Sequence, residues 1–188
     1  SRGALLAIAA MTFVLWMRSR RKVLGGVVLL SLSVVFVLLM PDSWSDRMRT
    51  IRSYEEDASS MGRINAWNMA IKIANDRITG GGFLVEKLEV FQQYAEDPER
   101  VLTAHSIYFQ ALGEQGWIGL ILFLAIGATA FWTTMSIRRQ AKQRPDTLWA
   151  YELAGMLQVG MVGYAVGGAF LSLTYLDLAY NLVVIVIA

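Results

Sequence analysis

Residues 116–135 read GWIGLILFLAIGATAFWTTM, and this uncharged stretch decides the fold. A helix that crosses about 30 Å of hydrocarbon needs roughly 20 apolar residues. Residues 23–40 and 149–172 are also long enough and almost free of charge, and shorter apolar stretches occupy residues 3–17 and 178–188. The sequence therefore predicts an all-α fold, a polytopic transmembrane helical bundle. Because apolar stretches stand at both ends, we expect the chain to be the C-terminal part of a larger membrane protein.

Composition supports this class. The chain is 55% apolar and 17% charged, with a mean hydropathy of +0.45. An ordinary soluble domain is about 45–50% apolar and about 25% charged. There is no cysteine, which excludes thiol chemistry and a cysteine-ligated metal.

Two basic clusters fix the expected topology. Short loops rich in Lys and Arg stay in the cytoplasm. Two predicted spans separate the clusters, so both can be cytoplasmic while residues 41–103 face outward. We therefore predict two transmembrane helices in residues 1–40, an outer loop at 41–103, and three helices in 104–188, of which the last is truncated. The cluster residues are Arg18, Arg20, Arg21 and Lys22, and Arg138, Arg139, Lys142 and Arg144.

The outer loop is expected to contain short helices. Residues 41–60 are polar and mixed in charge, which is typical of an irregular, partly helical segment. Apolar residues recur at helical spacing over 61–78, which predicts an amphipathic helix. Three glycines at 80–82 end that helix, and a second short helix is predicted over 83–96.

Glycines also mark the predicted spans. A helix is expected to begin near Thr103 and to run through His105 into the third span, where Gly116 permits a bend. In the fourth span, Gly163 and Gly167 form a GxxxG pattern, which favours close helix packing over a ligand site.

Five polar residues are expected to gather on the outer membrane face. Charged groups near spans are costly and are therefore candidates for function. Two of these residues are arginines, one is the only histidine and two are acids: Arg2, Arg63, His105, Glu114 and Asp177.

Arginine and histidine together suit chemistry on a lipid-linked phosphate or pyrophosphate. Arginine binds phosphate oxygens in a bidentate way and can neutralise a departing phosphate. Histidine can take a proton from an attacking hydroxyl near neutral pH. Structural alternatives remain open: His105 as a capping residue, Arg63 in a cation–π pair with Trp67, Arg2 as an anchor at the headgroups, and Asp177 as a helix cap.

Several catalytic motifs are absent. The sequence contains no HExxH, no GxSxG, no Walker loop and no paired aspartates of the kind that hold a metal on a sugar nucleotide. We therefore predict no metal and no cofactor.

Three blocks resemble the O-antigen ligase and polymerase-like membrane family. They are SRGALLAIAA (1–10), MGRINAWNMAIKIANDRITGGGF (61–83) and AHSIYFQALGEQGWIGLILF (104–123), and they occur in the family's order. The loop is also similar to ligases associated with exosortase systems. One departure is Ser106, where the family more often has Asn, so a side-chain amide role is in doubt there.

The resemblance implies a GT-C-type glycosyltransferase in the bacterial inner membrane, a multi-pass protein with its active site on the periplasmic side. Such enzymes move a glycan from undecaprenyl pyrophosphate to an acceptor hydroxyl. The family's arginines match Arg2 and Arg63, for pyrophosphate binding and leaving-group stabilisation, and its histidine matches His105, for base or acceptor orientation. Trp67 and Glu114 match recurring positions without a clear role, and no family motif covers Asp177.

Several functions stay open at this point. Within the family, the acceptor can be a lipid A core sugar, a growing polysaccharide or a protein hydroxyl, which gives a ligase, a polymerase or a protein O-oligosaccharyltransferase. A lipid-linked glycan transporter or flippase would use the same arginines. An assembly subunit that packs through the glycine-rich fourth span is a further reading.

Overall fold

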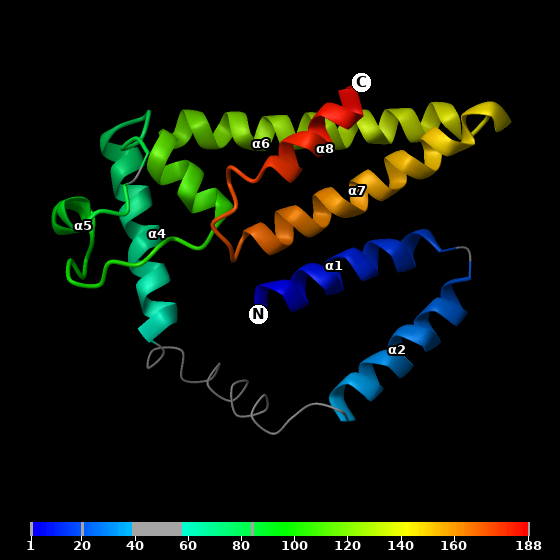
Figure 1. Cartoon of the computed structure of the whole chain (residues 1–188), viewed down its shortest axis with the longest axis horizontal. Coiled ribbons are helices and arrows are strands. Elements are labelled where there is room, and N and C mark those ends of the chain that lie inside the picture. The colour runs from blue at the N-terminus through cyan, green and yellow to red at the C-terminus, as the bar shows by residue number, and fades with distance from the viewer. Residues whose placement is uncertain (1, 20, 39–57, 84, 188) are drawn as a thin grey trace.

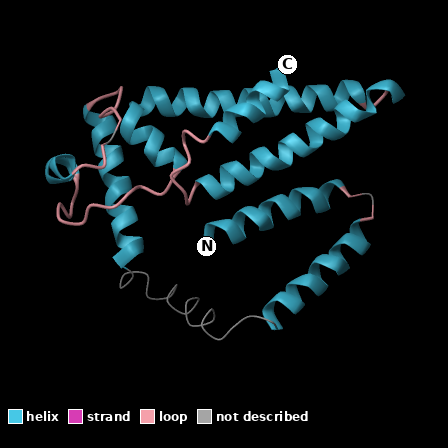
Figure 2. Ribbon diagram, in the orientation of Figure 1, coloured by secondary structure: helices cyan, strands magenta, loops and turns pink. Residues whose placement is uncertain are grey.

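The computed structural model describes residues 2–19, 21–38, 58–83 and 85–187, which fold into helices joined by loops (Figure 1). Figure 2 shows no β-strand within those ranges, so the all-α prediction is confirmed. The elements in chain order are α1 (Arg2–Arg18), α2 (Lys22–Leu38), α4 (Ala58–Asp76), α5 (Leu88–Tyr94), α6 (Ile107–Ala141), the short 3-10 helix η2 (Pro145–Thr147), α7 (Leu148–Gly168) and α8 (Asp177–Ile187).

One helix in the described ranges, α6, is both long and apolar enough to cross a membrane. It contains the predicted span at 116–135. Shorter apolar helices cover Gly3–Arg18, Lys22–Leu32 and Asp177–Ile187. The arrangement of several spans into a polytopic bundle stays a prediction.

Large apolar side chains point outward from α2 and α6. Val23 and Leu38 of α2 are 83% and 76% exposed, and Trp132 of α6 is 68% exposed. Soluble monomers rarely expose contiguous apolar surface of this kind. These faces therefore suit contact with lipid or with further apolar helices.

The glycine pattern of α7 forms the contact with α1. A Cβ atom on Gly163 would lie 2.5 Å from Sδ of Met11, and one on Gly167 would lie 3.2 Å from Cβ of Ala7. The absence of side chains thus lets the two helices approach closely. The interpretation of these glycines as a packing face is confirmed.

The loop helices α4 and α5 form a small layer with its own apolar core. Phe91 of α5 is fully buried, and it packs with residues of α4 and of the two connecting segments. This layer lies against the first turns of α6 (Figure 1). The buried members of the core are Ala66, Met69, Ile73, Val85, Phe91 and Ala104.

A bend at Gly116 divides α6, as the sequence predicted. Gly116 has φ 69° and ψ −165°, a conformation that glycine adopts without strain. The glycine run 80–82 docks on this bend: the Gly81 N–H donates to the Gly113 carbonyl (2.9 Å) and the Gly82 N–H to the Glu114 carbonyl (2.8 Å). α4 already ends at Asp76, before the glycine run, so the run does not end this helix as predicted and instead fixes the start of α6 against the loop layer.

Gly116→Ala is expected to destabilise the protein by more than about 2 kcal/mol, because it combines left-handed backbone strain with a steric clash. The new Cβ would lie 2.1 Å from the Ile78 carbonyl oxygen. Gly127→Ala is the matched control in the same helix, since a Cβ there meets nothing within 4 Å. Thermal unfolding of the full-length protein in detergent measures both. Equal melting temperatures for the two variants would contradict the assignment.

The predicted bounds of three helices are wrong. α4 covers Ala58–Asp76 rather than 61–78, and α5 covers Leu88–Tyr94 rather than 83–96. α6 begins at Ile107 rather than near Thr103, so His105 precedes the helix. The cause is the backbone of His105, whose φ of 44° is incompatible with a right-handed helix. The predicted loop segment 41–57, with the arginines that it contains, lies outside the described residues.

Candidate active site

The segment from Arg100 to Ala104 runs alongside the first half of α4. A Cβ on Gly62 would lie 2.0 Å from Cδ1 of Leu102, so these residues are in contact. Asn65, 6% exposed, fixes the preceding turn: its Nδ2 donates to the Asp97 carbonyl (2.8 Å), and its Oδ1 accepts from the Asp97 N–H (3.1 Å). Residues 58–67 of α4 and residues 97–104 thus form one unit.

Trp67 joins this unit to the start of α6. Its Nε1 donates to the Ala104 carbonyl (2.7 Å), and its ring stacks on Phe109 at a centroid separation of 4.7 Å. Trp67 therefore positions the backbone next to His105. The indole is occupied by these contacts, so the alternative of a cation–π pair with Arg63 has no support among the described contacts.

His105 is held in a strained backbone conformation by its neighbours. The Ala104 N–H donates to Oε1 of Glu86 (3.0 Å), and the Ala104 carbonyl accepts from Trp67. Ser106, the next residue, is buried at 1% exposure. A non-glycine residue at positive φ costs about 1–3 kcal/mol and persists only when its surroundings enforce it. The half-buried imidazole has no hydrogen-bond partner among the described residues, so it can act on a ligand.

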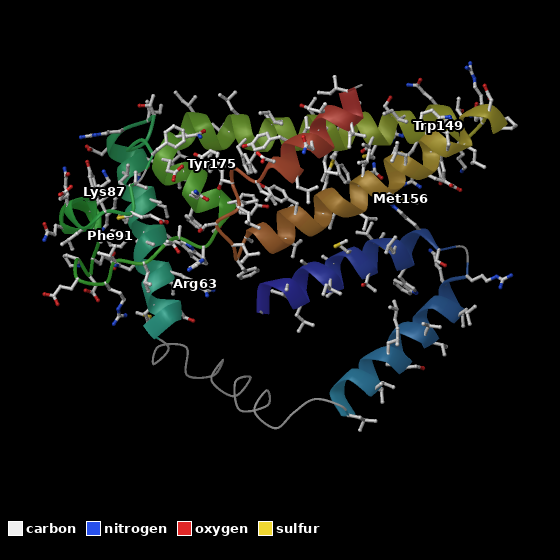
Figure 3. The ribbon with its side chains drawn as sticks, in the orientation of Figure 1. Arg63, Lys87, Phe91, Trp149, Met156 and Tyr175 are labelled. Atoms are coloured by element: carbon white, nitrogen blue, oxygen red, sulfur yellow. The ribbon has the colours of Figure 1, made fainter. Side chains whose placement is uncertain are left out.

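Two buried polar atoms beside this segment also lack partners within the described part of the chain. They are Nε of Arg63 and Oγ1 of Thr103. Figure 3 shows Arg63 on the half of α4 that lies nearer residue 58, where the chain returns from α5 to α6. A buried donor without a partner costs about 1–3 kcal/mol, and more when the group is charged. An anionic ligand would satisfy the Arg63 guanidinium.

The backbone of Arg2 lies at the end of the helices where α6 begins, after His105. Arg2 is the first residue of α1, and a Cβ on the neighbouring Gly3 would lie 2.6 Å from Cβ of Phe170. At the adjacent end of α7, a Cβ on Gly168 would lie 2.5 Å from Cδ1 of Ile107, two residues after His105. These contacts connect the starts of α1 and α6 through the end of α7. The side chain of Arg2 lies outside the described residues.

Glu114 is committed to a polar network that holds the α7–α8 loop. It is 8% exposed and accepts hydrogen bonds from Oη of Tyr175 and from Nε2 of Gln110 (3.4 Å). Gln110 in turn accepts from Oγ1 of Thr174 (2.8 Å). Burial and the hydrogen bond to Glu114 raise the pKa of Tyr175 above its ordinary value. Tyr175 and Gln110 thus occupy the Glu114 carboxylate, which ties the first half of α6 to the α7–α8 loop.

Tyr175→Phe is expected to destabilise the protein by about 1–3 kcal/mol, because the buried Glu114 carboxylate loses its strongest donor. Adding Glu114→Gln should restore part of that loss, a coupling that a double-mutant cycle measures by thermal unfolding. Tyr94→Phe is the control, because Tyr94 donates to Asp76 at an exposed site. A melting temperature unchanged by Tyr175→Phe would contradict a stabilising role for the hydrogen bond between Tyr175 and Glu114.

Asp177 stands apart from these groups. It is the first residue of α8 and is exposed. Among the described residues no hydrogen bond or ion pair involves its side chain. In the same ranges, no three His, Cys, Asp or Glu side chains gather as metal ligands would.

Sequence reasoning missed Thr103, Asn65 and the residues bonded to Glu114 directly or through Gln110, which are Tyr175, Gln110 and Thr174. The signal for Asn65 was a polar residue within the apolar face of an amphipathic helix. Tyr175 and Thr174 gave no local signal, since their partners are about 60 residues away in the chain.

A family model described as O-antigen ligase matches residues 1–124 of the chain. The chain belongs to the O-antigen ligase family. The matched range contains Arg2, Arg63, His105 and Glu114, and it ends before Tyr175 and Asp177. The O-antigen ligase family is membrane-associated, and its members are ligases of the glycosyltransferase type that use lipid-linked glycans and acceptors. No curated protein and no solved structure matches the chain.

Proposed function

We propose that the chain is part of an inner-membrane O-antigen ligase that moves a glycan from undecaprenyl pyrophosphate to a hydroxyl of a lipid A core sugar on the periplasmic face. The proposal is carried by the placement of Arg63 on the part of α4 that packs against the segment leading to the constrained His105, with its Nε buried and without a hydrogen-bond partner among the described residues. Within the described residues the Arg63 guanidinium has no counter-ion and the His105 imidazole has no hydrogen-bond partner, and such a pair of groups suits a pyrophosphate leaving group and an attacking hydroxyl.

Each residue has a distinct role in this mechanism. His105 takes the proton of the acceptor hydroxyl as that oxygen attacks the anomeric carbon of the donor sugar. The bond from that carbon to the pyrophosphate oxygen breaks, and the electron pair leaves with the pyrophosphate. Arg63, together with Arg2, stabilises the charge that develops there. Trp67 positions the backbone before His105, and neither a metal nor a cofactor takes part.

An apolar cavity beside the site supports a lipid-linked donor. It lies between α6, α7 and α8 and has a volume of about 530 Å³, and its lining includes Ile107 and Tyr108, which follow His105 closely in the chain. Its lining is mostly apolar and includes Leu122, Phe131 and Val183. An isoprenoid chain bound in this cavity, with its pyrophosphate toward Ile107 and Tyr108, would fit the proposed donor.

The direct test is an assay of the full-length protein with a polyprenyl-pyrophosphate-linked glycan and a lipid A core acceptor. Transfer is measured once in membranes and once in detergent, by the mobility shift of the acceptor. A transferase makes product in both. A transporter has no closed compartment to work across in detergent and makes no product there. Folded protein that supports transfer in membranes but makes no product in detergent would therefore favour the transport reading.

The same assay separates the acceptor classes. With the donor alone, a polymerase lengthens the donor-linked glycan, whereas a ligase leaves it unchanged until the core acceptor is added. A protein O-oligosaccharyltransferase labels a polypeptide instead. Chain lengthening without acceptor would overturn the ligase proposal while keeping the glycosyltransferase chemistry.

A further inference from the structure

A second polar site lies at the end of the bundle opposite His105. A cavity of about 310 Å³ opens there between α1, α6 and α7, and we refer to it as the basic pocket. Four of its lining residues are cations and two are polar donors or acceptors: Arg18, Arg138, Arg139, Lys142, Tyr151 and Gln158.

The two arginines nearest the bundle axis are fixed in place by neutral partners. Nη1 of Arg18 donates to the Gly155 carbonyl (2.8 Å), and Nη1 of Arg138 donates to Oε1 of Gln158 (3.2 Å). Nη2 of Arg18 donates to that same amide oxygen. Arg138 also donates to Oη of Tyr151 (2.8 Å) and lies over its ring, 4.5 Å from the centroid. Both guanidiniums thus converge on the amide oxygen of Gln158, which is 1% exposed.

The positive charge of the basic pocket is not neutralised by the described residues. No Asp or Glu lines it, and the ion pairs in the described ranges involve other residues. The nearest acids in sequence, Asp146 and Glu152, are exposed and form none of these pairs. Nε of Arg138 is buried and has no hydrogen-bond partner among the described atoms. Two like charges that share one neutral acceptor repel each other, and a bound anion would relieve that repulsion.

The geometry points to a phosphate group as the ligand, and we propose that the basic pocket binds one. Guanidinium forks match phosphate oxygens, and Lys142 adds a point charge. Phe131 and Met135 line the same cavity, so a phosphate there would have apolar surface beside it. Basic pockets between membrane helices hold anionic lipid headgroups in this way. The phosphate can come from an anionic phospholipid or from a soluble phosphate, and the proposal does not depend on the transferase chemistry at His105.

Native mass spectrometry of the full-length protein in detergent tests the proposal. Phosphatidylglycerol, phosphatidylcholine and inorganic phosphate are titrated separately. We expect phosphatidylglycerol to bind more tightly than phosphatidylcholine, and Arg138→Gln to weaken it about fivefold, which corresponds to one basic residue near an anionic headgroup. Saturable binding of inorganic phosphate, lost in the same variant, would instead identify a soluble ligand and would equally support a phosphate site.

Two further variants keep the test decisive. Lys142→Gln removes a pocket charge that makes no side-chain hydrogen bond among the described residues, so it is expected to fold normally even if Arg138→Gln does not. Arg21→Gln removes the same charge at an exposed position outside the pocket. We expect weaker binding in Lys142→Gln and unchanged binding in Arg21→Gln. Equal affinities for the two phospholipids without phosphate binding, or equal losses in both variants, would overturn the proposal.

Discussion

His105→Asn in the full-length protein is expected to lower the rate of glycan transfer about 100- to 10,000-fold, the range for loss of a general base. Asparagine is chosen because it tolerates the left-handed backbone that His105 adopts at φ 44°. The substitution therefore removes the base and keeps the local fold. Initial rates are measured at equal amounts of folded protein, over a range of acceptor concentrations.

His105→Gly separates strain from chemistry. Glycine adopts a positive φ without cost, whereas histidine loses about 1–2 kcal/mol there. We expect His105→Gly to be at least as stable as the parent protein and as inactive as His105→Asn. This combination would mean that the backbone strain is retained for the position of the imidazole. Transfer by His105→Asn within about twofold of the parent rate would remove His105 from the mechanism.

The sequence predicted those parts of the fold that depend on local composition. The uncharged run at 116–135 determines an apolar helix, and Gly116 determines a bend. Gly163 and Gly167 determine a close helix contact. The family could likewise be predicted from three separate blocks, because each block is a local sequence pattern that needs no tertiary contact to be read.

The candidate site could be predicted only as a set of residues on one face. The helix predicted through His105 failed because the conformation of this residue is imposed from outside its own segment. Glu86 and Trp67 fix Ala104 from positions 18 and 37 residues away in the chain. No periodicity within residues 101–110 carries that information.

The two acids illustrate the same limit. Glu114 and Asp177 carry the same charge and both flank apolar stretches, so their local pattern did not separate them, although the family resemblance matched only Glu114 to a recurring position. Glu114 is buried and bonded to Tyr175, while Asp177 is exposed at the start of α8. Their difference depends on how the α7–α8 loop folds back on α6, a tertiary contact without a local pattern.

Arg63→Ala is the second variant with a large expected effect. Removing one stabiliser of a developing charge typically lowers the rate about 100- to 1000-fold. We expect a loss of this size in glycan transfer, mainly in kcat, because the pyrophosphate gains most of its charge as the glycosidic bond breaks. Arg77→Ala is the matched control, since Arg77 directly follows the same helix, is exposed and forms an ion pair with the adjacent, exposed Asp76.

Arg63→Lys distinguishes a fork from a simple charge. Lysine keeps the positive charge but cannot bind two phosphate oxygens in one plane, so we expect it to recover only part of the activity. Loss of the charge at position 63 is expected to lower activity without lowering stability. Because Nε of Arg63 is buried and has no partner among the described residues, Arg63→Met is expected to keep or raise the melting temperature while transfer is lost. A melting temperature that falls in proportion to activity would instead make Arg63 a structural residue of the loop layer.

The double variant Arg63→Ala with His105→Asn tests whether the two residues act in one step. Groups that stabilise the same transition state are strongly non-additive, so the second substitution should cost far less than it does alone. Independent losses that multiply would place Arg63 and His105 in separate steps, with Arg63 in donor binding and His105 in acceptor activation. That result would keep both residues in the site. In that case Arg63→Ala would raise the KM for the donor and leave kcat unchanged.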